Sequence, residues 1–117
     1  MAGALTRGDV RLYRFQLPDK ERPVVVLTRS SAIVHLNSVT IVPITSTIRS
    51  VPSEVLLTEA DGMKSPCAVN LHRAVTVDKK HLGRRVASLG ADRMKQICAA
   101  LEFALGCGDS GPGIDIH

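Results

Sequence analysis

Short runs of β-branched residues constrain the fold of this 117-residue chain more than any other feature of its sequence. The two clearest runs, 24–28 and 39–44, are too short and too rich in Val and Ile for helices, so we expect buried strands there. Similar patterns predict further strands over 10–15, 53–58, 67–72 and 85–89. Pro43 cannot donate a backbone hydrogen bond, which predicts a strand edge or a bulge at that position.

The pattern becomes helical from Ala91 onward. Apolar residues recur there at three- and four-residue spacing, which predicts one buried helix face made of Met94, Ile97, Cys98, Leu101 and Leu105. Gly106 then ends the helix, and the Gly- and Pro-containing stretch beyond it predicts a disordered tail over 108–117. Many short strands followed by one terminal helix predict a mainly β fold, in which the helix closes one opening of a small, curved antiparallel sheet or barrel.

Signals for membrane insertion, metal ions and cofactors are missing from the sequence. The first residues contain no apolar targeting segment, and no apolar run approaches the roughly 18 residues of a membrane span, so we expect a cytoplasmic protein without membrane contact. The three Cys lack the C-x-x-C spacing of zinc and redox sites, and no two of the four His stand at i and i+4. We therefore expect neither a metal ion nor a cofactor.

Positive charge is concentrated in one segment. Residues 78–95 contain six Lys or Arg and two Asp, which accounts for the whole net charge of +4. A basic segment of this kind is either an ordinary solvated surface or a contact for phosphate groups. Lys79 and Arg84 are the candidates for phosphate contact within it.

A cation and a row of hydroxyls occur at the ends of the two clearest predicted strands. Arg22 precedes the first, and Thr45, Ser46 and Thr47 follow the second. A guanidinium can hold phosphate oxygens bidentately, and a hydroxyl can donate to the same group, so the pair is suited to stabilising the developing charge when RNA is cut without a metal. The alternatives are a surface ion pair of Arg22 with a neighbouring acid and an ordinary strand hydroxyl at Thr45.

RNA cleavage of this kind also requires a base for the 2′-hydroxyl proton, and His72 is the candidate. It ends the predicted strand 67–72, and its ordinary pKa lies near neutrality. A structural role for His72 is the alternative. Cys67 is five residues away on the same predicted strand and therefore faces the other side, which argues against a thiol–imidazole pair. No G-x-S-x-G segment suggests a serine hydrolase.

Five segments in order resemble the MazF/PemK family, the toxin halves of bacterial toxin–antitoxin modules. They are Arg7–Val10, Arg22–Leu27, Val42–Ile48, Pro52–Val55 and Thr76–Arg85, and the likeness extends over roughly 6–105. The resemblance implies one toxin domain over 6–107 with an SH3-like barrel of the CcdB/PemK type. It also implies a homodimeric, metal-independent endoribonuclease that cleaves single-stranded RNA at specific sequences and leaves 2′,3′-cyclic phosphate and 5′-hydroxyl ends. A cognate antitoxin with an acidic segment is the implied inhibitor.

The resemblance also carries over individual residues. Arg22 matches the catalytic arginine of the family, Thr45 its catalytic threonine, and Ser46 a further phosphate contact. The loop before Arg22 is short and leaves Glu21 as a substitute for an acid or His of other members. Near His72 many members have an acidic residue, so His72 is either the base or a nucleobase contact.

Asn70 is a further candidate for RNA contact, because its side chain has both a donor and an acceptor for reading a base edge. Two alternative functions stay open. One is a poison of DNA gyrase with the same barrel, as in CcdB toxins, and the other is a catalytically degenerate RNA-binding module.

Overall fold

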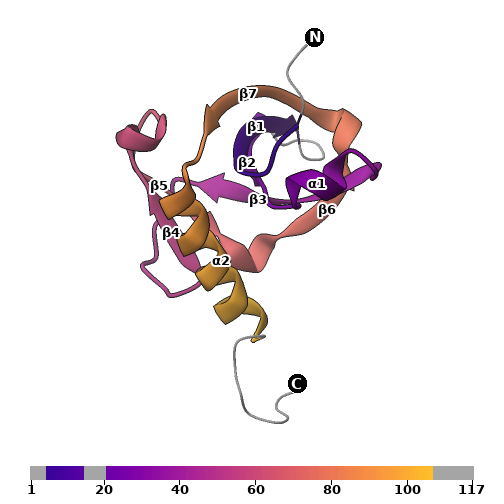
Figure 1. The fold of residues 1–117 in the computed structure, drawn as a ribbon. Coiled ribbons are helices and arrows are strands. Elements are labelled where there is room, and N and C mark those ends of the chain that lie inside the picture. Colours follow the sequence, from indigo (N-terminus) through magenta and orange to yellow (C-terminus); the bar gives the residue numbers. More distant parts are fainter. Residues whose placement is uncertain (1–4, 15–20, 107–117) are drawn as a thin grey trace.

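The structure is a computed structural model that describes residues 5–14 and 21–106 (Figure 1). It is mainly β with a C-terminal helix, as predicted. The elements are β1 (Asp9–Arg14), β2 (Glu21–Val26), α1 (Ser30–Ile33), β3 (Ser38–Thr45), β4 (Glu54–Leu57), β5 (Cys67–Asn70), β6 (Val75–Asp78), β7 (Leu82–Ser88) and α2 (Ala91–Leu105). Three 3₁₀ turns lie at Glu59–Asp61, Leu71–Arg73 and Lys79–His81. The predicted tail over 108–117 lies outside the described residues.

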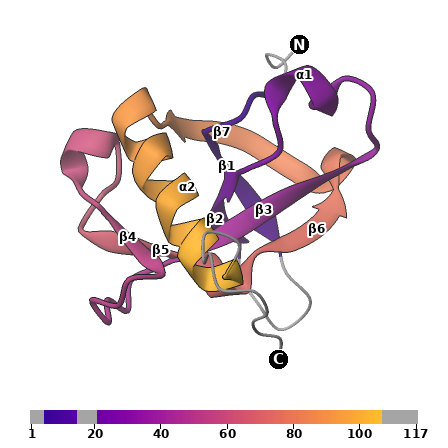
Figure 2. The ribbon, with the colours of Figure 1, turned by 60° about the horizontal axis from the view of Figure 1, so that its bottom comes forward.

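The strands form one strongly curved antiparallel sheet with β3 at its centre (Figures 1 and 2). The order is β4-β5-β3-β2-β1-β7, and β6 also pairs with β3. The first half of β3 pairs with β6 from Ser38 to Ile41, and its end pairs with β5 at Ile44 and Thr45. Along its other edge β3 pairs with β2. Helix α2 lies across the β4–β5 end of the curved sheet (Figure 2).

Pro43 lies inside β3, opposite Val24 of β2 and without a register shift, so the predicted bulge is wrong, but its other side is a local strand edge. On the side away from β2, Pro43 falls between the segment that pairs with β6 and the segment that pairs with β5. A residue without an N–H fits there because the partner strand changes at that point and neither β6 nor β5 pairs with position 43.

Buried side chains form two clusters because successive side chains of a strand point to opposite faces. The larger cluster lies between the sheet and α2 and includes Val25, Val42, Val69 and Ile97. The smaller cluster lies under α1 and includes Val24, Val26, Ile33, Val39 and Ile41. Strand β2 is therefore apolar on both faces over 24–26, which explains its uninterrupted run of Val.

Helix α2 was predicted with nearly correct ends. Gly106 adopts a left-handed conformation, with φ of 75°, and its N–H donates to Glu102 O at 2.8 Å, so it terminates the helix as expected. Ile97 is buried, and Met94 and Leu101 pack against the larger cluster. Leu105 is 64% exposed, so its predicted place on the buried face is wrong.

Two elements were missing from the prediction, and two strands, β4 and β5, were predicted too long. Strand β2 begins at Glu21, so Arg22 lies within the strand and not before it. Helix α1 and strand β6 lie in segments without a strong periodic pattern. Strand β5 ends at Asn70 instead of reaching His72, because the Asn70 side chain accepts the His72 N–H at 3.0 Å and caps a 3₁₀ turn. His72 therefore lies in that turn, and the argument that it faces away from Cys67 on a shared strand is wrong.

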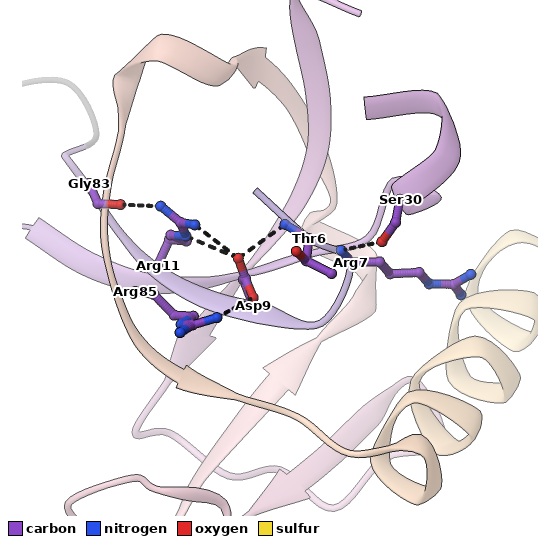
Figure 3. Close-up of polar contacts among 7 residues, drawn as sticks. All are labelled: Thr6, Arg7, Asp9, Arg11, Ser30, Gly83 and Arg85. Carbon is purple, nitrogen blue, oxygen red and sulfur yellow. Dashed lines mark hydrogen bonds and ion pairs between the residues drawn. The ribbon is translucent and has the colours of Figure 1, made fainter. Parts of the chain in front are cut away.

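A buried ionic cluster joins β1 to β7 (Figure 3). Asp9 is 1% exposed, and its Oδ2 accepts from Arg11 Nη2 at 3.0 Å and Nε at 3.2 Å, and from the Thr6 N–H at 3.1 Å. Arg11 also donates to Gly83 O at 3.2 Å, and Arg85 lies 3.9 Å from Asp9 Oδ1. Part of the basic segment 78–95 is thus used to stabilise the fold.

A second ion pair, between Asp61 and Arg93, ties a 3₁₀ turn to α2. Arg93 Nε donates to Asp61 Oδ1 at 3.0 Å, and the Thr58 N–H donates to Oδ2 at 2.9 Å. Burial, the largest influence, raises the pKa of Asp61, but these hydrogen bonds and the Arg93 charge together outweigh it and lower the pKa. Burial, and then the charge of Asp61, raise the pKa of the nearby Cys67 thiol.

Candidate ribonuclease site

The register between β2 and β3 brings Arg22 and Thr45 together. Val24 lies opposite Pro43 and Val25 opposite Val42, and the paired stretch ends there. Arg22 and Thr45 each lie two residues beyond the last pair, at the same end of the two strands. Both line a groove of about 420 Å³. The two residues that the sequence analysis selected as a pair therefore line the same groove.

The groove lies on the sheet face that turns away from the core under α2. Val25, Val42 and Val69 belong to that core, so the side chains that alternate with them point to the other face. Asn70 and Thr47, both selected from the sequence, also line the groove. The strand alternation thus provides an apolar support on one side and a polar groove on the other.

Three charged residues that line the groove were not selected from the sequence: Arg49, Glu54 and Arg73. Arg49 follows β3 in a loop, Glu54 begins β4, and Arg73 ends the 3₁₀ turn after β5. Together with Arg22 they give the groove three guanidinium groups and one carboxylate. Such a lining attracts an anion, and guanidinium groups suit phosphate because they donate in a planar fork.

The Thr45 hydroxyl has one hydrogen-bond role filled and one available. Its Oγ1 accepts the N–H of Thr47 at 3.1 Å. A hydroxyl can accept and donate at the same time, and accepting from the backbone fixes the position of the oxygen. Its proton is therefore suited to donation toward a group held by Arg22.

Ser46 and Arg84 lie in a neighbouring hollow of about 570 Å³, which Thr45 also lines. That hollow includes apolar side chains of Leu12, Met63 and Val86. Thr45 therefore stands at the boundary between the groove and this second hollow. The two selected residues are adjacent to the groove without lining it.

The structure does not bring Lys79, Glu21 and His72 into the groove. Lys79 follows the residue that pairs with Ser38, at the opposite end of β3 from Thr45 and roughly 23 Å along the strand. Its Nζ donates to Ile33 O at 2.8 Å. Glu21 is exposed and alternates with Arg22 along β2. His72 is exposed, and Arg73 beside it lines the groove.

The described residues contain no group of three His, Cys, Asp or Glu side chains arranged to hold a metal ion. Within the same residues, no helix combines the length and apolar character needed to span a bilayer.

Comparison with known proteins gives consistent results. The family described as the PemK-like, MazF-like toxin of type II toxin–antitoxin systems matches residues 6–105. A probable endoribonuclease MazF5 of Mycobacterium tuberculosis is 42% identical over 87 residues, which is 74% of this chain and 80% of that protein. The endoribonuclease MazF3 of the same species is 35% identical over 83 residues, or 71% of this chain and 81% of that protein.

Solved structures agree with this assignment. The Mycobacterium tuberculosis toxin MazF-mt6 superposes with a TM-score of 0.77 at 31% identity, over 84% of this chain and 96% of that one. A mycobacterial endoribonuclease in complex with its cognate antitoxin gives a TM-score of 0.75 at 28% identity, over 88% of this chain and 96% of that one. The predicted barrel of the CcdB/PemK type is confirmed by these neighbours, and the chain belongs to the PemK-like, MazF-like toxins of type II toxin–antitoxin systems.

Proposed function

We propose that this protein is a cytoplasmic endoribonuclease toxin that cleaves single-stranded RNA at specific sequences without a metal ion. The observation that supports the proposal is that Arg22 and Thr45 line one groove together with two further guanidinium groups. Relatives that cover most of the chain are named endoribonucleases, which supports the same activity. Neither the gyrase poison nor the degenerate binding module gains support from these relatives.

The proposed reaction uses the nucleophile that RNA itself carries. The ribose 2′-oxygen attacks the adjacent phosphorus, the bond from phosphorus to the 5′-oxygen breaks, and the products carry a 2′,3′-cyclic phosphate and a 5′-hydroxyl. Arg22 holds the phosphate oxygens bidentately, and Thr45 donates to the charge that develops on them. Arg73 adds positive charge from the turn after β5.

A base must remove the 2′-hydroxyl proton, and the leaving 5′-oxygen must receive one. His72 remains our candidate base, although its turn sets Arg73, not His72, in the groove. Asn70 lines the groove and offers an amide to a nucleobase edge. Ser46, Thr47 and Arg84 extend the contact surface on either side of Thr45.

We further propose a homodimer that is inhibited by a cognate antitoxin of the MazE type. A related mycobacterial endoribonuclease is known in complex with its cognate antitoxin. An acidic segment of such an antitoxin fits a groove with three Arg and one Glu, because its carboxylates compete with RNA phosphates for the same guanidinium groups.

The test is incubation of purified protein with a long mixed-sequence RNA in EDTA, followed by mapping of the new ends. We expect cuts at a recurring short motif with 5′-hydroxyl ends, and loss of cutting in Arg22→Ala. Arg29→Ala is the matched control because Arg29 is exposed beside α1 and does not line the groove. Full activity of folded Arg22→Ala would contradict the proposed site. Absence of cutting by the folded wild-type protein would contradict the proposed activity.

A further inference from the structure

Glu54 holds the turn after β3 by two hydrogen bonds. Its Oε1 accepts the N–H of Arg49 at 3.0 Å and the N–H of Ser50 at 2.9 Å. Successive backbone N–H groups directed at one anion form a nest, which requires a left-handed residue. Ser50 has φ of 56°, a left-handed conformation that is strained for a residue other than glycine. The carboxylate offsets that strain.

The backbone of Glu54 is itself held in place by hydrogen bonds and strand pairing. The Glu54 N–H donates to Val51 O at 2.9 Å, and the Leu71 N–H donates to Ser53 O at 2.9 Å. Ser53 is 2% exposed, and Glu54 pairs with Asn70 in the sheet. The position of Glu54 is therefore set by β4 and β5, and its carboxylate in turn restrains the backbone of Arg49 through a hydrogen bond.

Arg49 is the groove residue whose backbone Glu54 restrains. Arg22 has its backbone in a strand and Arg73 in a capped turn, whereas Arg49 lies in a loop and lines the same groove. A cation on an unrestrained loop loses conformational entropy when it binds a ligand, and fixing its backbone beforehand removes part of that cost. The hydrogen bonds from Arg49 and Ser50 to Glu54 supply this restraint.

Glu54 is poorly suited to contact the phosphate itself. Phosphodiester oxygens only accept hydrogen bonds and carry negative charge, so a carboxylate repels them. The second oxygen, Oε2, is buried and has no hydrogen-bond partner among the described residues. A buried unpaired oxygen is destabilising, so the gain from this carboxylate resides in the Oε1 contacts to the turn.

We propose that Glu54 is a positioning residue that presents the Arg49 guanidinium to the phosphate backbone of bound RNA. The proposal rests on the proposed ribonuclease function and adds a residue pair to its groove. Glu54 acts only through Arg49, so the two side chains are energetically coupled. Their coupling, and not the effect of either change alone, is the quantity to measure.

The experiment is a double-mutant cycle of Glu54→Ala and Arg49→Ala, read by single-turnover cleavage and by the Kd for a single-stranded oligonucleotide. We expect each single variant to lose about tenfold, as for one weakened phosphate contact, and the double variant to be no worse than Arg49→Ala. Glu54→Gln should stay within about threefold of wild type, because its amide oxygen still accepts both backbone N–H groups. Thermal melting of each variant verifies its fold.

Amide hydrogen exchange gives a readout that does not depend on activity. The N–H groups of Arg49 and Ser50 should be protected in the wild type and in Glu54→Gln and exchange faster in Glu54→Ala. Additive losses in the double variant, or a Glu54→Gln variant as weak as Glu54→Ala, would overturn the proposal. If folded wild-type protein does not cut RNA, the proposed function fails. The double-mutant cycle measured by oligonucleotide binding, together with amide exchange, then still tests whether Glu54 positions Arg49.

Discussion

Replacing Thr45 by Val tests whether its hydroxyl supports the transition state. Val keeps the β-branched shape that suits a strand, so the change removes the hydroxyl and little else. In the ground state the loss is one exposed hydrogen bond from the Thr47 N–H, at 3.1 Å, which contributes about 1 kcal/mol or less to stability. In the transition state the loss is a donor to the developing phosphorane charge, and removal of one such donor costs about 2.7–4 kcal/mol. We therefore expect kcat to fall by about 10²–10³.

Single-turnover cleavage of a short RNA that contains one recognised site measures this effect directly. Thr40→Val is the matched control, because Thr40 lies on the same strand, its hydroxyl contacts Thr76 at 3.2 Å, and it does not line the groove. The control should cleave at the wild-type rate. A Thr45→Val protein that melts normally and cuts within threefold of wild type would refute a catalytic role for the hydroxyl. A rise in KM with unchanged kcat would assign it to substrate binding instead.

Three further predictions concern stability and reactivity. Asp9→Ala should cost about 3–5 kcal/mol in urea unfolding, because it leaves the charge of Arg11 buried without its carboxylate; a loss below 1 kcal/mol would contradict this. The folded-state pKa of Asp61 is lowered, so the stability that its charged form contributes is present above the unfolded pKa of about 3.9 and is lost as pH falls through the folded value. Asp61→Asn should therefore have a lower free energy of unfolding than wild type at pH 7, and this difference should narrow below about pH 4. Burial raises the pKa of the Cys67 thiol, so peptide mapping after alkylation of the folded protein should find Cys98 modified well before Cys67, and equal rates would contradict its burial.

All strands except β6, and the terminal helix, could be predicted because they follow from local pattern. The β-branched runs of β2 and β3 are recognisable without any partner, and Gly106 marks the end of α2. The end of β5 could not be predicted in the same way. It depends on one side-chain hydrogen bond, from the His72 N–H to Asn70, which competes with continued extension. Sequence patterns of hydrophobicity do not record such a competition.

The site was predictable where the chemistry lies at strand ends and was missed where it lies in turns. Arg22 and Thr45 were selected because a cation and a hydroxyl stand next to apolar runs. Arg49 and Arg73 belong to polar segments in which most cations are merely solvated, so nothing in their local sequence distinguishes them. Glu54 joins the groove only because β4 pairs with β5. These three residues are identified by tertiary pairing alone.

The site residues also specify the register on which the site depends. Strand β2 is buried on both faces over 24–26, so hydrophobic burial alone distinguishes poorly between one register and a shift by one residue. The charged Arg22 resists such a shift because it would move the guanidinium to the face occupied by Val25 and the core. Pro43 resists it because its missing N–H is tolerated where β3 changes partner between β6 and β5. Arg22 and Pro43, which both line the groove, thus favour the strand register that forms it. A substitution of Arg22 can therefore change stability as well as activity, so both must be measured for each variant.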